Sequence, residues 1–148
     1  MGLIRDLGKG TVALDSAVFI YFLEEHDEYL PVVEPLFKEI DAGWREAVTS
    51  SLTLLEVLVV PYRVGDLDLA HRYESLLTRS RGLRTVDIDR NQLKAAALLR
   101  ARYRLRTPDA IQIGAALSSS SKTFVTNDRD LPEIPGLRII QLEDYLKK

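Results

Sequence analysis

The chain has 148 residues, of which 46% are hydrophobic and 28% charged, with no cysteine and a formal net charge of −2. This composition is ordinary for one globular domain with a sizeable core, and the lack of cysteine excludes a disulfide framework, a thiolate nucleophile and a cysteine-ligated zinc site. No stretch approaches the ~18 uncharged apolar residues of a membrane span and the start lacks a secretory apolar core, so we expect a single domain, residues 1–148, in the cytoplasm and away from membranes.

Short apolar segments alternate with helical patterns along the chain. Strands are predicted near 11–15, 46–50, 84–88, 122–127 and 137–141, and helices near 16–25, 30–42, 51–64, 66–80, 89–104 and 108–119. Strands that alternate with helices pair in parallel, because the helices supply the crossovers. We therefore predict an α/β fold, a three-layer α/β/α sandwich around a central, mainly parallel sheet of about five strands, with ligands bound outside the carboxyl ends of the strands.

Four acidic residues lie where apolar strands end or apolar helices occur: Asp15, Glu56, Asp109 and Asp128. Asp15 closes the first predicted strand and Asp128 follows the fourth, so both belong to the same edge of the sheet. Asp109 lies in the first turn of a helix that begins at Thr107-Pro108, with Thr107 as the predicted N-cap. Glu56 is the one charged residue in an apolar helix that we expect to be buried nearly all round.

An ionised carboxylate is costly to desolvate unless it is paired or coordinates a metal. Ligand sets made only of oxygen suit hard cations, which points to Mg²⁺ or Mn²⁺. Such ions can activate a water and stabilise the leaving oxygen of a phosphodiester displacement, without any cysteine or catalytic histidine. Without metal, we expect the mutual repulsion of the carboxylates to raise some of their pKa values and to destabilise the protein.

Each acid also has an ordinary structural explanation. Asp15 could serve only as a helix N-cap, and Asp109 could interact only with the helix dipole. Asp128 could belong to turn chemistry, and Glu56 could be paired with a buried arginine or lysine. All four explanations would have to hold together, and the shared position at strand ends favours a common site.

Positive charge is concentrated in one segment, Arg79–Arg106. It carries nine basic and two acidic residues, a net charge of +7, which leaves −9 for the rest of the chain. Such asymmetry is typical of a surface that faces a polyanion, although a solvated helix face would give the same pattern. On the predicted helix two pairs share a face, and these four residues are the candidate RNA contacts: Arg100 with Arg104, and Arg102 with Arg106.

Aromatic and histidine residues give weaker signals. Tyr103 is flanked by arginines and is the aromatic residue that we would test for stacking on a base. The two histidines, His26 and His71, lie in polar helical surroundings, where surface roles outweigh catalysis.

Four short motifs together resemble those of the PIN domain family. They are Leu14-Asp15-Ser16, the segment 51–56 that ends at Glu56, Thr107-Pro108-Asp109-Ala110 and Thr126-Asn127-Asp128. Each motif alone is weak, but the four in this order are fairly specific, and the resemblance spans roughly Thr11 to Leu142. Within the family, the chain is similar to the VapC-type ribonuclease toxins of bacterial and archaeal toxin–antitoxin pairs.

The resemblance implies an endoribonuclease dependent on Mg²⁺ or Mn²⁺. It implies that the metal is held, directly or through water, by Asp15, Glu56, Asp109 and Asp128, with supporting hydroxyls from Thr126 and Ser16. It further implies a homodimer, a small antitoxin that inserts into the active-site groove, and a structured RNA substrate. The sequence leaves open whether Asp130 approaches the metal.

Other functions remain open at this point. Ala17 departs from the family pattern, where many relatives carry a polar residue. Magnesium-dependent aspartyl phosphatases expect a second aspartate at that position, and receiver domains expect paired acids after the first strand and a late lysine, so both are disfavoured. The remaining alternatives are a catalytically silent PIN-like module that binds RNA or protein, and a housekeeping RNA-processing nuclease.

Overall fold

The structure, a computed structural model, describes residues 2–146. Its elements in chain order are α1 (Gly2–Leu7), β1 (Val12–Leu14), α2 (Ser16–Leu23), α3 (Leu30–Asp41), β2 (Ala47–Ser50), α4 (Leu52–Val64), α5 (Leu67–Arg79), β3 (Leu83–Val86), α6 (Arg90–Tyr103), α7 (Thr107–Ser118), β4 (Thr123–Thr126), β5 (Arg138–Gln141) and the 3-10 helix η1 (Leu142–Tyr145). Every predicted strand and helix is present, with boundaries within two residues of those predicted. The two short helices α1 and η1 were not predicted.

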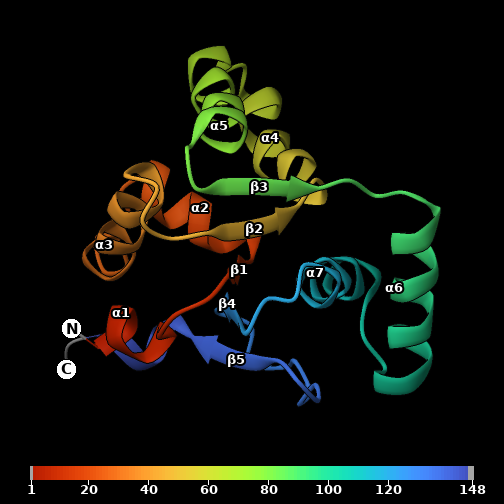
Figure 1. Ribbon diagram of the computed structural model, residues 1–148. Coiled ribbons are helices and arrows are strands. Elements are labelled where there is room, and N and C mark those ends of the chain that lie inside the picture. The colour runs from red at the N-terminus through yellow and green to blue at the C-terminus, as the bar shows by residue number, and fades with distance from the viewer. Residues whose placement is uncertain (1, 147–148) are drawn as a thin grey trace.

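The five strands form one parallel sheet in the order β3-β2-β1-β4-β5. β1 lies in the centre, where Ala13 pairs with Val48 of β2 and with Phe124 of β4. Because all strands run in the same direction, the carboxyl ends of β1 and β4 lie side by side (Figure 1). The predicted three-layer α/β/α architecture is confirmed.

The two faces of the sheet are covered by different helices. Alternate side chains of a strand point to opposite faces. Leu14 and Val125 therefore pack in a core with α1 to α5, whereas Ala13 and Phe124 pack in a second core with α6 and α7. Figure 1 shows α6 and α7 together on one side of the sheet and α2 and α3 on the other. A layer of helices therefore covers each face of the sheet.

Helix α4 is not buried all round, so this expectation was wrong. Thr53 and Val57 are buried, but Leu55 is 60% and Val64 68% exposed, and Val59, Val60 and Tyr62 are also exposed. One face of α4 packs on the domain, whereas the other presents apolar side chains to solvent. Despite such apolar helices, none within residues 2–146 is both long enough and apolar enough to cross a membrane.

A buried amide joins β2, α4 and α7 near the strand ends. The Gln112 side chain, 3% exposed, accepts a hydrogen bond from the backbone N–H of Ser50 at 3.2 Å and donates one to Thr53 Oγ1 at 2.8 Å. The Thr53 hydroxyl lies 2.6 Å from that of Thr49, which donates to the carbonyl of Leu14 in β1. This chain of hydrogen bonds links α4 and α7 to β1 and β2. Because the groups are buried, no water can replace a lost partner, and each bond is costly to break.

Replacing Gln112 with leucine should destabilise the fold, because the buried Ser50 N–H would lose its amide partner. We expect the free energy of unfolding in urea to fall by about 1–3 kcal/mol. Gln92→Leu is the matched control, since the Gln92 amide makes an exposed hydrogen bond with Ser118 between α6 and α7. Equal stability losses in the two variants would contradict the role given to the Gln112 network.

Candidate active site at the strand ends

Asp15 directly follows β1 and begins α2. Its Oδ1 accepts the backbone N–H of Ser16 at 2.8 Å, and its Oδ2 accepts the hydroxyl of Thr126 at 2.7 Å. The backbone N–H of Asp15 is bonded to Val125 of β4, which extends the pairing of the two strands to this point. Asp15 is therefore an N-cap, as the structural alternative proposed, and its second oxygen is also fixed beside the end of β4.

Asp128 lies two residues after β4, beside Asp15. Thr126 joins them, because its hydroxyl accepts the backbone N–H of Asp128 at 3.2 Å while it donates to Asp15. Oδ1 of Asp128 accepts the backbone N–H of Asp130 at 2.9 Å, so the turn chemistry considered for Asp128 is present. Asp130 lines the same hollow as Asp128 and has an exposed side chain.

Asp109 lies in the first turn of α7, with its side chain 15% exposed. Thr107 is the first residue of this helix, and Arg106 occupies the N-cap position that we predicted for Thr107. The Arg106 guanidinium donates from Nε to Asp109 Oδ2 at 3.2 Å, and its Nη2 lies 3.9 Å from Asp128 Oδ2. An arginine that is itself 76% exposed thus bridges two of the four acids.

Glu56 reaches the cluster from α4 and is half-buried. Gln112 Nε2 lies 3.4 Å from Glu56 Oε1, which ties the carboxylate to the buried network of α7. Within residues 2–146, Glu56 forms no ion pair with arginine or lysine, so the structure does not bear out the alternative of a buried cationic partner.

The four carboxylates interact electrostatically. Burial raises the pKa of Asp15, and the negative charge of Asp128 adds to this, while the hydrogen bonds from Thr126 and Ser16 and the charge of Arg106 act in the opposite direction. Burial also raises the pKa of Glu56, with a further rise from the charges of Asp15 and Asp109.

Asp109 follows the same pattern. Burial raises its pKa and Arg106 opposes the rise, while Asp128 and Asp15 add to it. Four acids from distant parts of the sequence therefore share one electrostatic environment at the strand ends, where negative charge is costly.

The residues fit a hard divalent cation in their chemistry. As the side chains stand, no three acidic or histidine side chains in residues 2–146 come together tightly enough to hold an ion. All the cluster's donors are oxygen, the ligand type that Mg²⁺ and Mn²⁺ prefer, and the guanidinium of Arg106 now occupies a cation's place between Asp109 and Asp128. Because the Arg106 side chain is mostly exposed, it can leave that place without breaking the core.

The basic residues of the segment 79–106 are all exposed. The predicted helix faces were wrong, because α6 ends at Tyr103, and Arg104 and Arg106 follow it in the corner before α7. Arg100 is engaged in this corner: its guanidinium donates to the carbonyl of Leu105 at 2.9 Å and to Thr107 Oγ1 at 3.0 Å. The assignment of Arg100, Arg102, Arg104 and Arg106 to RNA stays a prediction.

Two contributors to the site were missed by the sequence reasoning. Gln112 lies in the helix predicted near 108–119 but was not among the candidate residues, although a lone amide among the apolar residues of a helix is a signal for a buried polar network. Arg106 was assigned to RNA alone, although its spacing of three residues before Asp109 on a helix start allows an ion pair.

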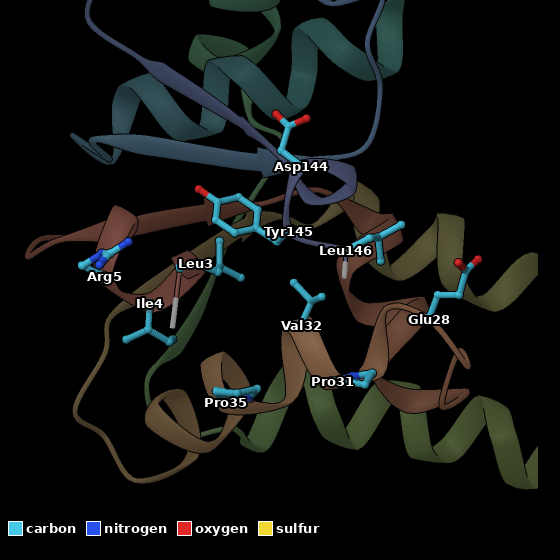
Figure 2. Close-up of a pocket in the computed structure, with 11 residues that line it drawn as sticks. Leu3, Ile4, Arg5, Glu28, Pro31, Val32, Pro35, Asp144, Tyr145 and Leu146 are labelled. Atoms are coloured by element: carbon cyan, nitrogen blue, oxygen red, sulfur yellow. The ribbon is translucent and has the colours of Figure 1, made fainter. Parts of the chain in front are cut away.

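A separate pocket of about 800 Å³ lies between α1, α3 and η1. Figure 2 shows Leu3, Val32 and Tyr145 around this hollow, with Arg5 and Glu28 at its margins. None of the four acids lines it. We therefore place the candidate site at the strand ends, where Asp109 and Asp128 line a hollow of about 540 Å³.

Comparisons with known proteins identify the fold and the family of the chain. No curated protein sequence matches the chain. Solved structures with the same fold include a toxin–antitoxin complex from Klebsiella pneumoniae (TM-score 0.64, 18% identity, 85% of this chain and 94% of that chain) and DNA-bound VapBC from Salmonella typhimurium (0.63, 23%, 90% and 99%). VapBC2 from Rickettsia felis, bound to a DNA fragment from its promoter, is also similar (0.61, 22%, 89% and 98%). The family model of the PIN domain matches residues 12–137, which is most of the chain, and this protein therefore belongs to the PIN domain family.

Proposed function

We propose that this protein is an endoribonuclease dependent on Mg²⁺ or Mn²⁺ and the toxin of a type II toxin–antitoxin pair, acting in the cytoplasm. The observation that carries the proposal is the gathering of Asp15, Glu56, Asp109 and Asp128 at one edge of the sheet, with the pKa values of three of them raised chiefly by burial. Membership of the PIN domain family supports it.

The four acids would hold the metal, directly or through water. A divalent ion in such a site supplies a water of lowered pKa and stabilises charge on the phosphate during an in-line displacement. Thr126 and the Ser16 backbone N–H orient the Asp15 carboxylate, and the Gln112 side-chain amide orients the Glu56 carboxylate by donating a hydrogen bond to it. Orientation of this kind favours catalysis because little reorganisation is then needed during the reaction.

Arg106 has two roles in the proposal. Without metal its guanidinium neutralises part of the charge on Asp109 and Asp128. With Asp109 and Asp128 holding a metal, the exposed Arg106 guanidinium would be free to donate to a phosphate oxygen of RNA, for which arginine is well suited. Arg102, Arg104 and the other exposed basic residues of 79–106 would extend the phosphate-binding surface.

Protein partners also belong to the proposal. The similar structures are a toxin–antitoxin complex from Klebsiella and DNA-bound VapBC complexes from Rickettsia and Salmonella, so we propose a small antitoxin partner for this chain. We also propose a homodimer, which the resemblance to VapC-type toxins implies. The exposed apolar side chains of α4, such as Leu55, Val59 and Tyr62, offer a surface that a protein partner would shield from water.

Asp15→Asn and Asp109→Asn should each abolish RNA cleavage while the fold stays intact, because each removes a charged metal ligand without changing side-chain size. The measurement is gel analysis of total RNA after incubation with Mg²⁺, with circular dichroism to verify folding. Chelation of the metal should stop the wild-type protein, and Asp27→Asn, an exposed acid outside the cluster, is the control that should cut normally. Full cleavage by both site variants would refute the nuclease assignment.

The metal-free protein should lose stability as the pH rises. Asp15, Glu56 and Asp109 have raised pKa values in the fold, whereas in the unfolded chain they ionise near their ordinary values of 3.8, 4.5 and 3.8. Their stabilising contribution is therefore complete below those values and is lost as the pH rises through the folded pKa values. Urea unfolding in a chelator should show Asp15→Asn and wild type to be similar at about pH 4, and the variant to be the more stable at about pH 8.

Mg²⁺ should reverse this trend in the wild type, because the ion binds the ionised carboxylates. The rise in unfolding midpoint on adding Mg²⁺ should be larger at about pH 8 than at about pH 5 and absent in Asp15→Asn. An equal rise with sodium chloride of matched ionic strength would assign the effect to general screening.

Expression of the wild-type chain should arrest bacterial growth, because the proposed toxin degrades cellular RNA. Asp109→Asn should allow growth at equal protein level, as judged by immunoblot, and so should co-expression of the protein encoded by the adjacent gene. Growth arrest by Asp109→Asn as strong as that by the wild type would separate toxicity from the proposed site.

A further inference from the structure

Two neighbouring hollows meet at the C-terminal end of α6. The hollow that contains Asp109 and Asp128, about 540 Å³, shares part of its lining with a second hollow of about 590 Å³. The shared lining consists of Tyr103, Leu131 and Pro132. We call the two hollows together the Tyr103 groove; the acids lie in the first hollow, and apolar and polar side chains both line the second.

Tyr103 combines an aromatic face with access to solvent. It is the last residue of α6, its side chain is partly buried against the core formed with α6 and α7, and it lines both hollows. Pro132 and Leu131 come from the loop after β4, so the groove has a flat ring on one element and small apolar groups on another. Such a setting suits a planar base, because stacking on an aromatic ring needs one rigid face and tolerates any base.

Arg104 adds an independent observation. It is the C-cap of α6 and has φ 55° and ψ 38°, the left-handed region in which glycine is favoured. Helix α4 ends in the same conformation and uses Gly65 there, with φ 74°. Glycine, which has no Cβ, would adopt this conformation without strain. An arginine at this position therefore indicates that its side chain has a function.

The Arg104 side chain has no such structural use in the described part of the chain. Neither a hydrogen bond nor an ion pair engages its guanidinium there, in contrast to Arg100, which fastens the corner. Arg104 lines the hollow that contains Asp109 and Asp128. An exposed guanidinium without a partner in residues 2–146, carried by a strained backbone, therefore lines the same hollow as the acids and Tyr103.

We propose that the Tyr103 groove binds an unpaired nucleotide of RNA next to the scissile phosphate, with its base stacked on Tyr103 and its phosphate held by Arg104. This inference deepens the proposed function and rests on it for the position of the scissile bond. A nucleotide within a duplex stays stacked on its neighbours, so the groove selects single-stranded or looped RNA. Pro132 and Leu131 shield the stacked base from water.

The test measures binding, with RNA kept intact by the Asp15→Asn background. The probe is a short fluorescein-labelled single-stranded RNA of mixed sequence, titrated by fluorescence anisotropy with Mg²⁺ over a range of sodium chloride concentrations, and the same strand in a perfect RNA duplex is the comparison. Tyr103→Leu should weaken single-strand binding by about 5- to 150-fold, because it removes the stacking of one base. Tyr103→Phe should bind normally, and duplex binding should not depend on Tyr103.

Arg104→Gly provides a second variant that does not risk the fold. It should raise the unfolding midpoint, because glycine relieves the strained conformation, and at the same time weaken RNA binding and reduce the slope of log affinity against log salt by about 0.7. Ser120→Gly is the matched control: Ser120 has φ 58° and lies beyond the opposite end of α7, so this change should also raise the midpoint but leave RNA binding unchanged.

The outcomes separate this inference from the proposed function. Equal single-strand affinity of Tyr103→Leu, Arg104→Gly and the background protein would overturn the Tyr103 groove, even if the wild type cuts RNA; a protein partner would then be the occupant to consider. Binding that depends on both residues in a protein whose wild type cuts no RNA would support the nucleotide groove and refute the hydrolytic function. Failure of the background protein to bind the single strand at all would also overturn the inference.

Discussion

The cost of negative charge on four carboxylates that gather at one edge of a sheet is the constraint on which the rest of this structure depends. Burial raises the pKa values of Asp15, Glu56 and Asp109, and the charges of neighbouring carboxylates add to the rise. A fold that brings such groups together must supply hydrogen-bond donors and positive charge locally, or bind a cation. Thr126, the Ser16 N–H, Gln112 and Arg106 provide the first two of these.

The sheet topology explains how the cluster forms from distant segments. β1 and β4 are neighbours, so the residues that follow them, Asp15 and Asp128, must lie at one edge, and the hydroxyl of Thr126 fills the space between them. Glu56 and Asp109 lie on helices, so strand pairing alone does not bring them to this edge. Gln112 belongs to α7, the helix that carries Asp109, and its buried amide hydrogen-bonds to residues of β2 and α4.

The sequence was sufficient for the five strands, for the helices α2 to α7 and for the four acids of the cluster. Strand ends and helix starts are local features, and acids at these points are visible without coordinates, which is why Asp15, Asp109 and Asp128 could be placed together. Tertiary packing decided the rest. The apolar composition of α4 did not reveal that Leu55 and Val64 would face solvent, since composition does not say which face lacks a partner.

Local breaks in helix periodicity were the second source of error. The pairing of Arg100 with Arg104 on one helix face assumed that α6 continues, whereas Arg104 turns left-handed and Arg100 bonds to the corner that follows. Non-glycine residues adopt this conformation at a cost of about 1–3 kcal/mol, so no propensity argument predicts it. The unfavourable residue at the turn is informative for that reason.

Arg104 and Arg106 have opposite effects on the stability of the folded chain. Arg106 relieves an electrostatic cost by bridging Asp109 and Asp128, and a metal ion that binds these acids has to displace it. Arg104 instead adds a conformational cost, and within residues 2–146 its guanidinium makes no hydrogen bond or ion pair that would offset it. In the proposed function, the Arg106 contacts would compete with metal binding but stabilise the metal-free protein, whereas the Arg104 conformation lowers the stability of both forms. Both costs would be offset together if metal and RNA bind as proposed, because the Arg106 guanidinium would then be free of the two acids and both arginines could contact phosphates. Metal and RNA should therefore bind with positive coupling, since each ligand removes a cost that the other would otherwise have to meet.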